Sequence, residues 1–189
     1  MKINDSIINS ITREFLFRTV GEEIPEGYCF SICYPLSILF TLLDIPNQIE
    51  FGSVDHNGIS VSHFWINFDD NGTILDPTIR QFVHYSDPFY FGDINESPVK
   101  INHKIIERTW EEEFPEIYES WSEIYYGKAP TIPRTSEFIL KMKELNRKAA
   151  LTLLHFIDKY QLSKKLEKFE YGKLYFKPIF AFYSSNRLS

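Results

Sequence analysis

Cysteine is scarce in this chain, with only Cys29 and Cys33 among 189 residues. Two cysteines four positions apart do not make the disulfide framework of a small secreted domain. Clusters of basic residues are also missing, and the net charge is -6, so the sequence lacks the positive patch that nucleic-acid binding needs. We therefore expect no nucleic-acid partner, and a reducing compartment in which a thiol stays free.

Long apolar stretches are absent as well. The longest apolar run, around residues 38–43, is far too short to span a bilayer. Residues 1–15 mix Asp5, Arg13 and Glu14 with polar residues, and they contain no apolar core of the kind that a signal peptide carries. The sequence predicts a cytoplasmic protein with no membrane partner, and it leaves open secretion by a route that needs no signal peptide.

Aromatic residues, in contrast, are abundant. They make up 16% of the chain, with 17 Phe and 11 Tyr against 8 Gly, which favours bulky packing layers and aromatic-lined grooves. A hydrophobic content of 43% with 24% charged residues is ordinary for a globular protein. Without repeats or a linker, 189 residues suit one core, so we expect a single domain over residues 1–189. The oligomeric state is not predicted.

The first half of the chain alternates between helical and strand patterns. Residues 3–18 read as an amphipathic helix, with Ile7, Ile8, Ile11, Phe15 and Leu16 on its apolar side. An apolar helix is expected at roughly residues 29–44, and Pro35 must fall within its first turn or kink it. Strands are then expected at 47–53, 59–68 and 73–76, separated by turn signals at 55–58 and 69–72.

The second half is expected to be mainly helical. After a loop around 86–98, the pattern predicts an acidic helix over 101–126 and a second helix over 135–160, capped by Thr135 or Ser136. The acidic side chains of the first of these helices are most simply a solvated face, and its aromatic residues a buried one. Residues 174–183 alternate like an edge strand.

Cys29 is expected where loop becomes helix, directly after Gly27 and Tyr28. A helix N-terminus lowers the pKa of a thiol, and its N–H groups can hold an oxyanion. Taken alone, a cysteine in an apolar segment is more often an inert core residue. Cys33 lies one turn further along the same face, and it stays a second candidate because Pro35 is typical of a first helical turn.

His63 lies in the middle of the strand expected at 59–68. Because side chains alternate, His63 and Trp65 should share one face of the strand, and Phe64 should lie on the other. An imidazole at a core-facing position needs a polar partner. For a histidine considered alone, a satisfied core residue and a catalytic base are about equally good interpretations.

The loop at residues 69–72 decides which side of the sheet Asp76 faces. If that loop has four residues, Phe68 pairs with Thr73, and Asp76 lies diagonal to His63 on the same face, within side-chain reach. A loop one residue longer or shorter would turn Asp76 to the other face. An aspartate at this place can also simply cap the following turn.

Together, Cys29, His63 and Asp76 supply a nucleophile, a base and an acceptor that orients the base. Cys29, Cys33, His56 and His63 could also be drawn as a zinc set, but their spacing matches no familiar zinc motif. His56 falls in the turn expected at 55–58 and is most simply solvated. We expect no metal and no cofactor.

At these residues the chain resembles the transglutaminase-like branch of the papain-like cysteine protease superfamily, in particular its bacterial members. The family motif is a nucleophilic Cys at a helix start, a Gly-Ile-Pro after that helix, and a His-x-Trp strand before an Asp-Pro-Thr. The matching segments here are Cys29, Leu43-Asp44-Ile45-Pro46, His63-Phe64-Trp65 and Asp76-Pro77-Thr78, followed by Gln81-Phe82. The resemblance covers residues 27–82, and its register favours Cys29 over Cys33 as the nucleophile.

The resemblance implies an α+β fold of papain-like, transglutaminase-like type, with the Cys helix packed on an antiparallel sheet and a helical elaboration at 101–160. It implies that His63 deprotonates Cys29, that the thiolate forms a thioester, and that Asp76 orients His63. Two departures stand out. Asp44 replaces the usual Gly after the helix, and Glu23 stands where a papain-type oxyanion-hole Gln would be, so the second oxyanion donor is unassigned.

Three functions are compatible with these residues. The first is a cysteine-dependent hydrolase, a peptidase or amidase whose substrate is a peptide, a protein or a small amide. The second is a transglutaminase, an acyltransferase, or a protein-glutamine deamidase that uses the same catalytic triad. The third is a non-catalytic binding module on a degenerate transglutaminase-like fold. The sequence favours the hydrolase.

Overall fold

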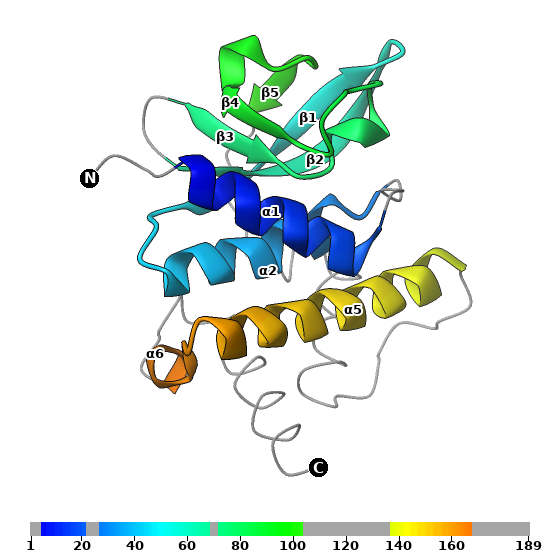
Figure 1. Cartoon of the computed structure of the whole chain (residues 1–189). Helices are drawn as coiled ribbons and strands as arrows, with labels where there is room; N and C mark the ends of the chain where they lie inside the picture. The colour runs from blue at the N-terminus through cyan, green and yellow to red at the C-terminus, as the bar shows by residue number, and fades with distance from the viewer. Residues whose placement is uncertain (1–4, 22–26, 69–71, 104–136, 168–189) are drawn as a thin grey trace. The chain divides into compact units, whose positions relative to one another are not determined.

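A computed structural model of the chain describes residues 5–21, 27–68, 72–103 and 137–167 (Figure 1). The chain divides into two compact units, Met1–Ile106 and Glu107–Ser189, and each is described by itself. The first unit holds two helices and a five-stranded antiparallel sheet, and the second holds the long helix α5. The expected α+β class is confirmed, and a single domain stays a prediction.

Helix α1 spans Asp5–Thr19, close to the predicted residues 3–18. Its apolar side is buried as expected at Ile8, Ile11, Phe15 and Leu16. Ile7 was expected on the same side but is 45% exposed. Because successive helical residues are about 100° apart, the buried stripe leaves this neighbour of Ile8 outside it.

Helix α2 spans Cys29–Leu42, and almost all of its side chains are buried. Pro35 lies in the second turn, so of the two predicted alternatives, a place in the first turn or a kink, the first does not hold. A proline there cannot donate its backbone hydrogen bond to Ser31 one turn earlier. The helix continues past Pro35 to Leu42 because its apolar residues are buried on every side.

The end of α2 explains how the chain accommodates Asp44 where glycine would be usual. Asp44 adopts a φ of 61°, a left-handed conformation that Asp tolerates better than most residues. Its N–H donates to Thr41 O at 3.0 Å, and the N–H of Ile45 donates to Phe40 O at 2.9 Å. These two bonds form a Schellman motif, so the helix ends as a glycine-terminated helix would.

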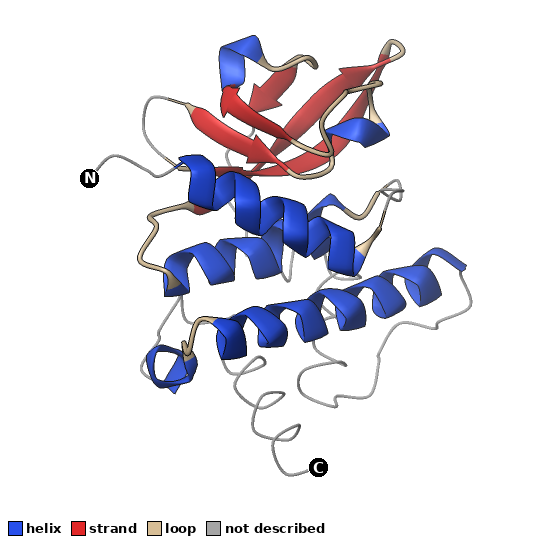
Figure 2. Cartoon of the chain, in the orientation of Figure 1, coloured by secondary structure: helices blue, strands red, loops and turns tan. Residues whose placement is uncertain are grey.

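The sheet has the strand order β4-β3-β2-β1-β5, with every neighbouring pair antiparallel (Figure 2). The strands are β1 Gln48–His56, β2 Ile59–Asn67, β3 Thr73–Asp76, β4 Tyr90–Asp93 and β5 Ile101–His103. The first three were predicted. β4 lies inside the predicted loop 86–98, and β5 lies where the predicted helix 101–126 would begin, so both of those predictions are wrong there.

The two hairpins of the sheet differ in how closely the sequence predicted them. β1 runs to His56, and the loop is only Asn57 and Gly58, whose φ values of 52° and 78° are those of a type I′ turn. In the second hairpin, the N–H of Phe68 donates to Thr73 O at 2.9 Å. The predicted register of that hairpin is confirmed.

The two faces of the sheet are covered differently. On one face, α2 packs against β2, with the rings of Phe30 and Phe64 5.1 Å apart. Figure 1 shows α1 beside α2 below the sheet. On the other face, a cluster is centred on Trp65, Ile74, Ile79 and Tyr90. The β2 strand is therefore buried on both sides at its centre.

In the second unit, α5 spans Glu137–Lys159 and the short α6 spans Ser163–Glu167. The predicted helix over 135–160 is confirmed as α5. The rest of the acidic helix predicted to 126, the proposed caps Thr135 and Ser136, and the strand predicted at 174–183 lie outside the described residues. Within the described ranges, no helix combines the length and apolar character needed to cross a bilayer.

Gly52 provides a test of the packing beside Trp65. A Cβ at position 52 would lie 2.7 Å from Trp65 Cη2 and would collide with the backbone oxygen of Asn102 in β5. We expect Gly52→Ala to lower the free energy of unfolding by about 2 kcal/mol, measured by urea denaturation. Gly58→Asn is the control, because a Cβ there meets open space and Asn tolerates the positive φ. Equal midpoints for both variants would contradict this packing.

Candidate active site

Three elements bring the expected site residues together within the first unit. Cys29 is the first residue of α2, His63 lies in the middle of β2, and Asp76 is the last residue of β3. The β2–β3 hairpin sets the relation between His63 and Asp76, and the packing of α2 against β2 sets the position of Cys29. The structure thus assembles three residues that are 34 and 13 positions apart in sequence.

His63 and Asp76 form a buried pair. His63 Nε2 lies 2.7 Å from Asp76 Oδ2, and both side chains are 0% exposed. The other carboxylate oxygen, Oδ1, accepts hydrogen bonds from the Thr78 N–H at 2.9 Å and from the Thr78 hydroxyl at 3.3 Å. Asp76 therefore caps the following turn and also orients the imidazole. Both contacts that the sequence left open for this residue are present.

Cys29 is the cysteine that meets the imidazole. Its side chain acts electrostatically on His63 and helps to raise the pKa of the imidazole, and Cys29 is 5% exposed. Since Asp76 engages Nε2, Nδ1 is the ring nitrogen left to face the thiol. At the first position of α2, the backbone N–H of Cys29 has no acceptor within the helix. The thiol therefore combines a neighbouring base with the positive end of a helix.

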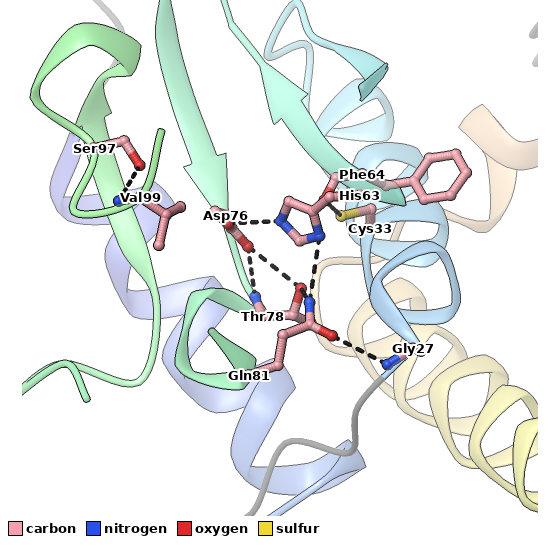
Figure 3. Close-up of polar contacts among 9 residues, drawn as sticks. All are labelled: Gly27, Cys33, His63, Phe64, Asp76, Thr78, Gln81, Ser97 and Val99. Atoms are coloured by element: carbon pink, nitrogen blue, oxygen red, sulfur yellow. Dashed lines mark hydrogen bonds and ion pairs between the residues drawn. The ribbon is translucent and has the colours of Figure 1, made fainter. Parts of the chain in front are cut away.

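Cys33 lies in a different environment one turn further along α2. Its thiol is fully buried and donates to the backbone oxygen of Phe64 at 3.5 Å (Figure 3). Burial raises the pKa of the Cys33 thiol well above its usual value, and the negative charges of Cys29 and Asp76 raise it further. Cys33 therefore stays protonated and serves as a small packing residue between α2 and β2.

Burial by itself lowers the pKa of His63, because it disfavours the imidazolium. The charge of Asp76 and its hydrogen bond act in the opposite direction, and the hydrogen bond and charge of Cys29 add to them. The net result raises the pKa of His63 from 6.5 to about 10. At neutral pH the site therefore favours an imidazolium held between a carboxylate and the Cys29 side chain.

Gln81 is a site residue whose contacts the sequence did not predict. It ends the short 3-10 helix Ile79–Gln81, which follows β3. Its Oε1 accepts the backbone N–H of Gly27 at 3.1 Å, while its Nε2 lies 3.3 Å from His63 Nδ1 and donates to Thr78 Oγ1 at 3.1 Å (Figure 3). One amide thus connects the imidazole, the turn after Asp76 and the chain just before Cys29. The feature of the sequence that could have indicated a role for Gln81 is its position five residues after Asp76.

Aromatic rings enclose the imidazole. The ring of Phe82 packs edge-on at 4.7 Å, and that of Trp65 lies 6.2 Å away on the same face of β2. The indole N–H of Trp65 donates to Glu50 Oε2 at 2.9 Å, and the other oxygen of Glu50 accepts from Asn67 at 2.7 Å. These bonds fix the indole, and the rings exclude water from one side of His63.

The alternative zinc set is not assembled. His56 hydrogen bonds to Asn57 at the tip of the first hairpin, whereas His63 contacts Asp76. Among the residues that the structure describes, no group of three or more His, Cys, Asp or Glu side chains is arranged to hold a metal. Glu23, at the position of a papain-type oxyanion Gln, lies outside the described residues.

Comparison with known proteins gives no relative for this chain. No family model, no curated protein and no solved structure matches it.

The pKa of His63 predicts how the fold responds to pH. Because the folded value of about 10 lies above the unfolded 6.5, the proton on His63 stabilises the fold fully below about pH 6.5. This contribution is lost as the pH rises towards 10. We expect the stability advantage of the wild type over His63→Gln to shrink steadily over that interval, measured by urea denaturation.

Nitrogen-15 NMR of the imidazole checks the cause directly. At about pH 8, both ring nitrogens of His63 should carry protons. Asp76→Asn keeps the shape of the side chain and removes its charge, so it should lower the pKa of His63. A wild-type His63 that titrates near its ordinary value would contradict the buried charge pair.

Proposed function

We propose that this protein is a cysteine-dependent hydrolase of amide bonds, with Cys29 as nucleophile, His63 as general base and acid, and Asp76 as the residue that orients His63. The observation that carries the proposal is the buried hydrogen bond between His63 Nε2 and Asp76, beside a Cys29 side chain that acts electrostatically on the same imidazole. A thiol, a base and an orienting acceptor in this order form the arrangement used for nucleophilic catalysis.

The environment of each member supports its role. Asp76 holds Nε2, so proton exchange with the thiol is confined to Nδ1. Cys29 at the start of α2 has the helix dipole to stabilise a thiolate. Cys33, the competing nucleophile, is buried and bonded to Phe64 O, and its raised pKa disfavours the reactive form. The geometry therefore favours Cys29.

The elements that carry these three residues also support a proposed fold family for the first unit. A helix that begins with the nucleophile and packs on an antiparallel strand bearing the base agrees with what the resemblance to transglutaminase-like enzymes implies. Asp76, the first residue of the Asp-Pro-Thr segment, ends β3 and is the third residue of the proposed triad. We therefore assign the first unit to a transglutaminase-like, papain-like fold.

The reaction proceeds through a thioester. In the resting site Nδ1 of His63 already holds the proton of Cys29, and the thiolate sulfur adds to the carbonyl carbon while the carbonyl electron pair moves to oxygen. When the tetrahedral intermediate collapses, the C–N bond breaks and the departing amine takes the proton from Nδ1. His63 then removes a proton from water, which attacks the thioester, releases the acid and restores the thiol. No metal or cofactor takes part in these steps.

Alkylation by iodoacetamide tests whether Cys29 is activated. In Cys33→Ala, where Cys29 is the one remaining thiol, we expect a rate near pH 7 at least about tenfold above that of a free cysteine, which is only a few per cent thiolate. His63→Gln in the same background should bring the rate back to the ordinary value. The activated-thiol proposal fails if the rate is ordinary from the start or insensitive to His63. That result would favour a non-catalytic binding module.

The fate of the thioester separates hydrolysis from acyl transfer. With a glutamine-containing protein and a labelled primary amine, we expect hydrolysis products and no incorporation above that of Cys29→Ala. Incorporation that depends on Cys29 would show a transglutaminase instead. Conversion of glutamine to glutamate in the absence of chain cleavage, detected by mass spectrometry, would show a deamidase.

A further inference from the structure

A thiol enzyme of this kind needs two hydrogen-bond donors for the oxyanion that forms when sulfur adds to a carbonyl. The backbone N–H of Cys29, at the first position of α2, can be one of them. The position that carries a Gln in papain-type enzymes is Glu23, whose ionised carboxylate has no hydrogen to donate. The sequence therefore leaves one donor to be found elsewhere.

The side-chain amide of Gln81 lies where such a donor is needed. Its Nε2 is 3.3 Å from His63 Nδ1. Its Oε1 accepts the backbone N–H of Gly27, two residues before Cys29, so the amide lies between the imidazole and the start of the helix that carries the nucleophile. Figure 3 shows Gln81 reaching from the 3-10 helix towards His63 on the side away from Asp76.

The orientation of this amide follows from its partners. A backbone N–H can only donate, so the bond from Gly27 identifies the Gln81 atom that it meets as the oxygen. The NH₂ group must then face His63, with one hydrogen directed at Thr78 Oγ1 and the other at Nδ1. The support is rigid, because Ile79 in the same short helix is fully buried in the Trp65 cluster.

The hydrogen of Gln81 Nε2 that points at His63 Nδ1 is the one available to the substrate oxygen. Nδ1 can accept it only while that nitrogen carries no proton. In the resting thiolate–imidazolium pair Nδ1 carries a proton, so two N–H groups face each other and Nδ1 cannot accept the Gln81 hydrogen. This is the state from which negative charge develops on the substrate oxygen.

We propose that Gln81 is a catalytic residue of this site, whose Nε2–H donates a hydrogen bond to the oxyanion formed when Cys29 adds to a carbonyl. The S–C bond forms as the carbonyl electron pair moves to oxygen, and the Gln81 and Cys29 N–H groups bind that oxygen. When the electron pair returns, the C–N bond breaks, the amine leaves with the proton from His63, and Nδ1, now without a proton, can accept the Gln81 hydrogen. This inference rests on the proposed function.

Two reactions of the same thiol separate an oxyanion donor from a residue that merely positions His63. Acylation by p-nitrophenyl acetate passes through an oxyanion, whereas alkylation by iodoacetamide at a saturated carbon does not. Both depend equally on the thiolate and on the arrangement of His63. The ratio of the two rates therefore reports the oxyanion donor alone.

The experiment uses the full chain with Cys33→Ala, with protein in excess over the ester, and follows p-nitrophenolate release and the mass of the acylated protein. We expect Gln81→Met to slow acylation about 10²-fold and to leave alkylation within about threefold. Gln81→Glu keeps an acceptor for the Gly27 N–H but has no donor, so it should lower the same ratio. Gln48→Met, at an exposed glutamine of β1, should change neither rate by more than about twofold.

The outcomes are distinct. Equal losses in both reactions would overturn the proposal and make Gln81 a positioning residue, and so would unchanged rates in both. Unequal losses with acylation the more affected, in both Gln81 variants, would support it. An unsubstituted Gln81 protein whose Cys29 alkylates no faster than a free cysteine would overturn the proposed function itself, together with this inference.

Discussion

The buried hydrogen bond between His63 and Asp76 is the interaction on which the rest of this site depends. Both side chains are withdrawn from water, and burying such groups is costly unless each finds its partner. The 2.7 Å contact supplies that partner for the imidazole, and Thr78 supplies two further hydrogen bonds to the carboxylate. The pair can therefore exist only if β2 and β3 are aligned in one register, because a shift by one residue would turn Asp76 to the opposite face.

From this pair the site extends in two directions. Towards α2, the Cys29 side chain acts electrostatically on His63, while burial, helped by the charges of Cys29 and Asp76, keeps the neighbouring Cys33 protonated. Towards the chain after β3, the turn that Asp76 caps leads into the 3-10 helix that presents Gln81. Gln81 then returns to the imidazole and reaches the backbone of Gly27, so the chain before the nucleophile and the chain after the acceptor are tied together.

Local patterns predicted the parts of this arrangement that depend on neighbours in sequence. Alternation along β2 gave the faces of His63 and Trp65, and the length of the loop after Phe68 gave the face of Asp76. The sequence pattern did not predict β4 and β5, where pairing with the rest of the sheet overrides local preference. β4 and β5 are only 4 and 3 residues long, too short for a periodic signal, and they form because the edges of the sheet pair with them.

The sequence by itself predicted that a histidine and an aspartate share one sheet face if the hairpin loop has four residues, because the period of a strand and the length of a loop are local quantities. It also narrowed the thiol to two cysteines on one helix. Only the tertiary structure decided which thiol meets the imidazole, since that depends on how α2 packs against β2. The tertiary structure also showed that Gln81 belongs to the site. Its contact with Gly27 joins residues 54 positions apart, and no local sequence pattern encodes a contact between such distant segments.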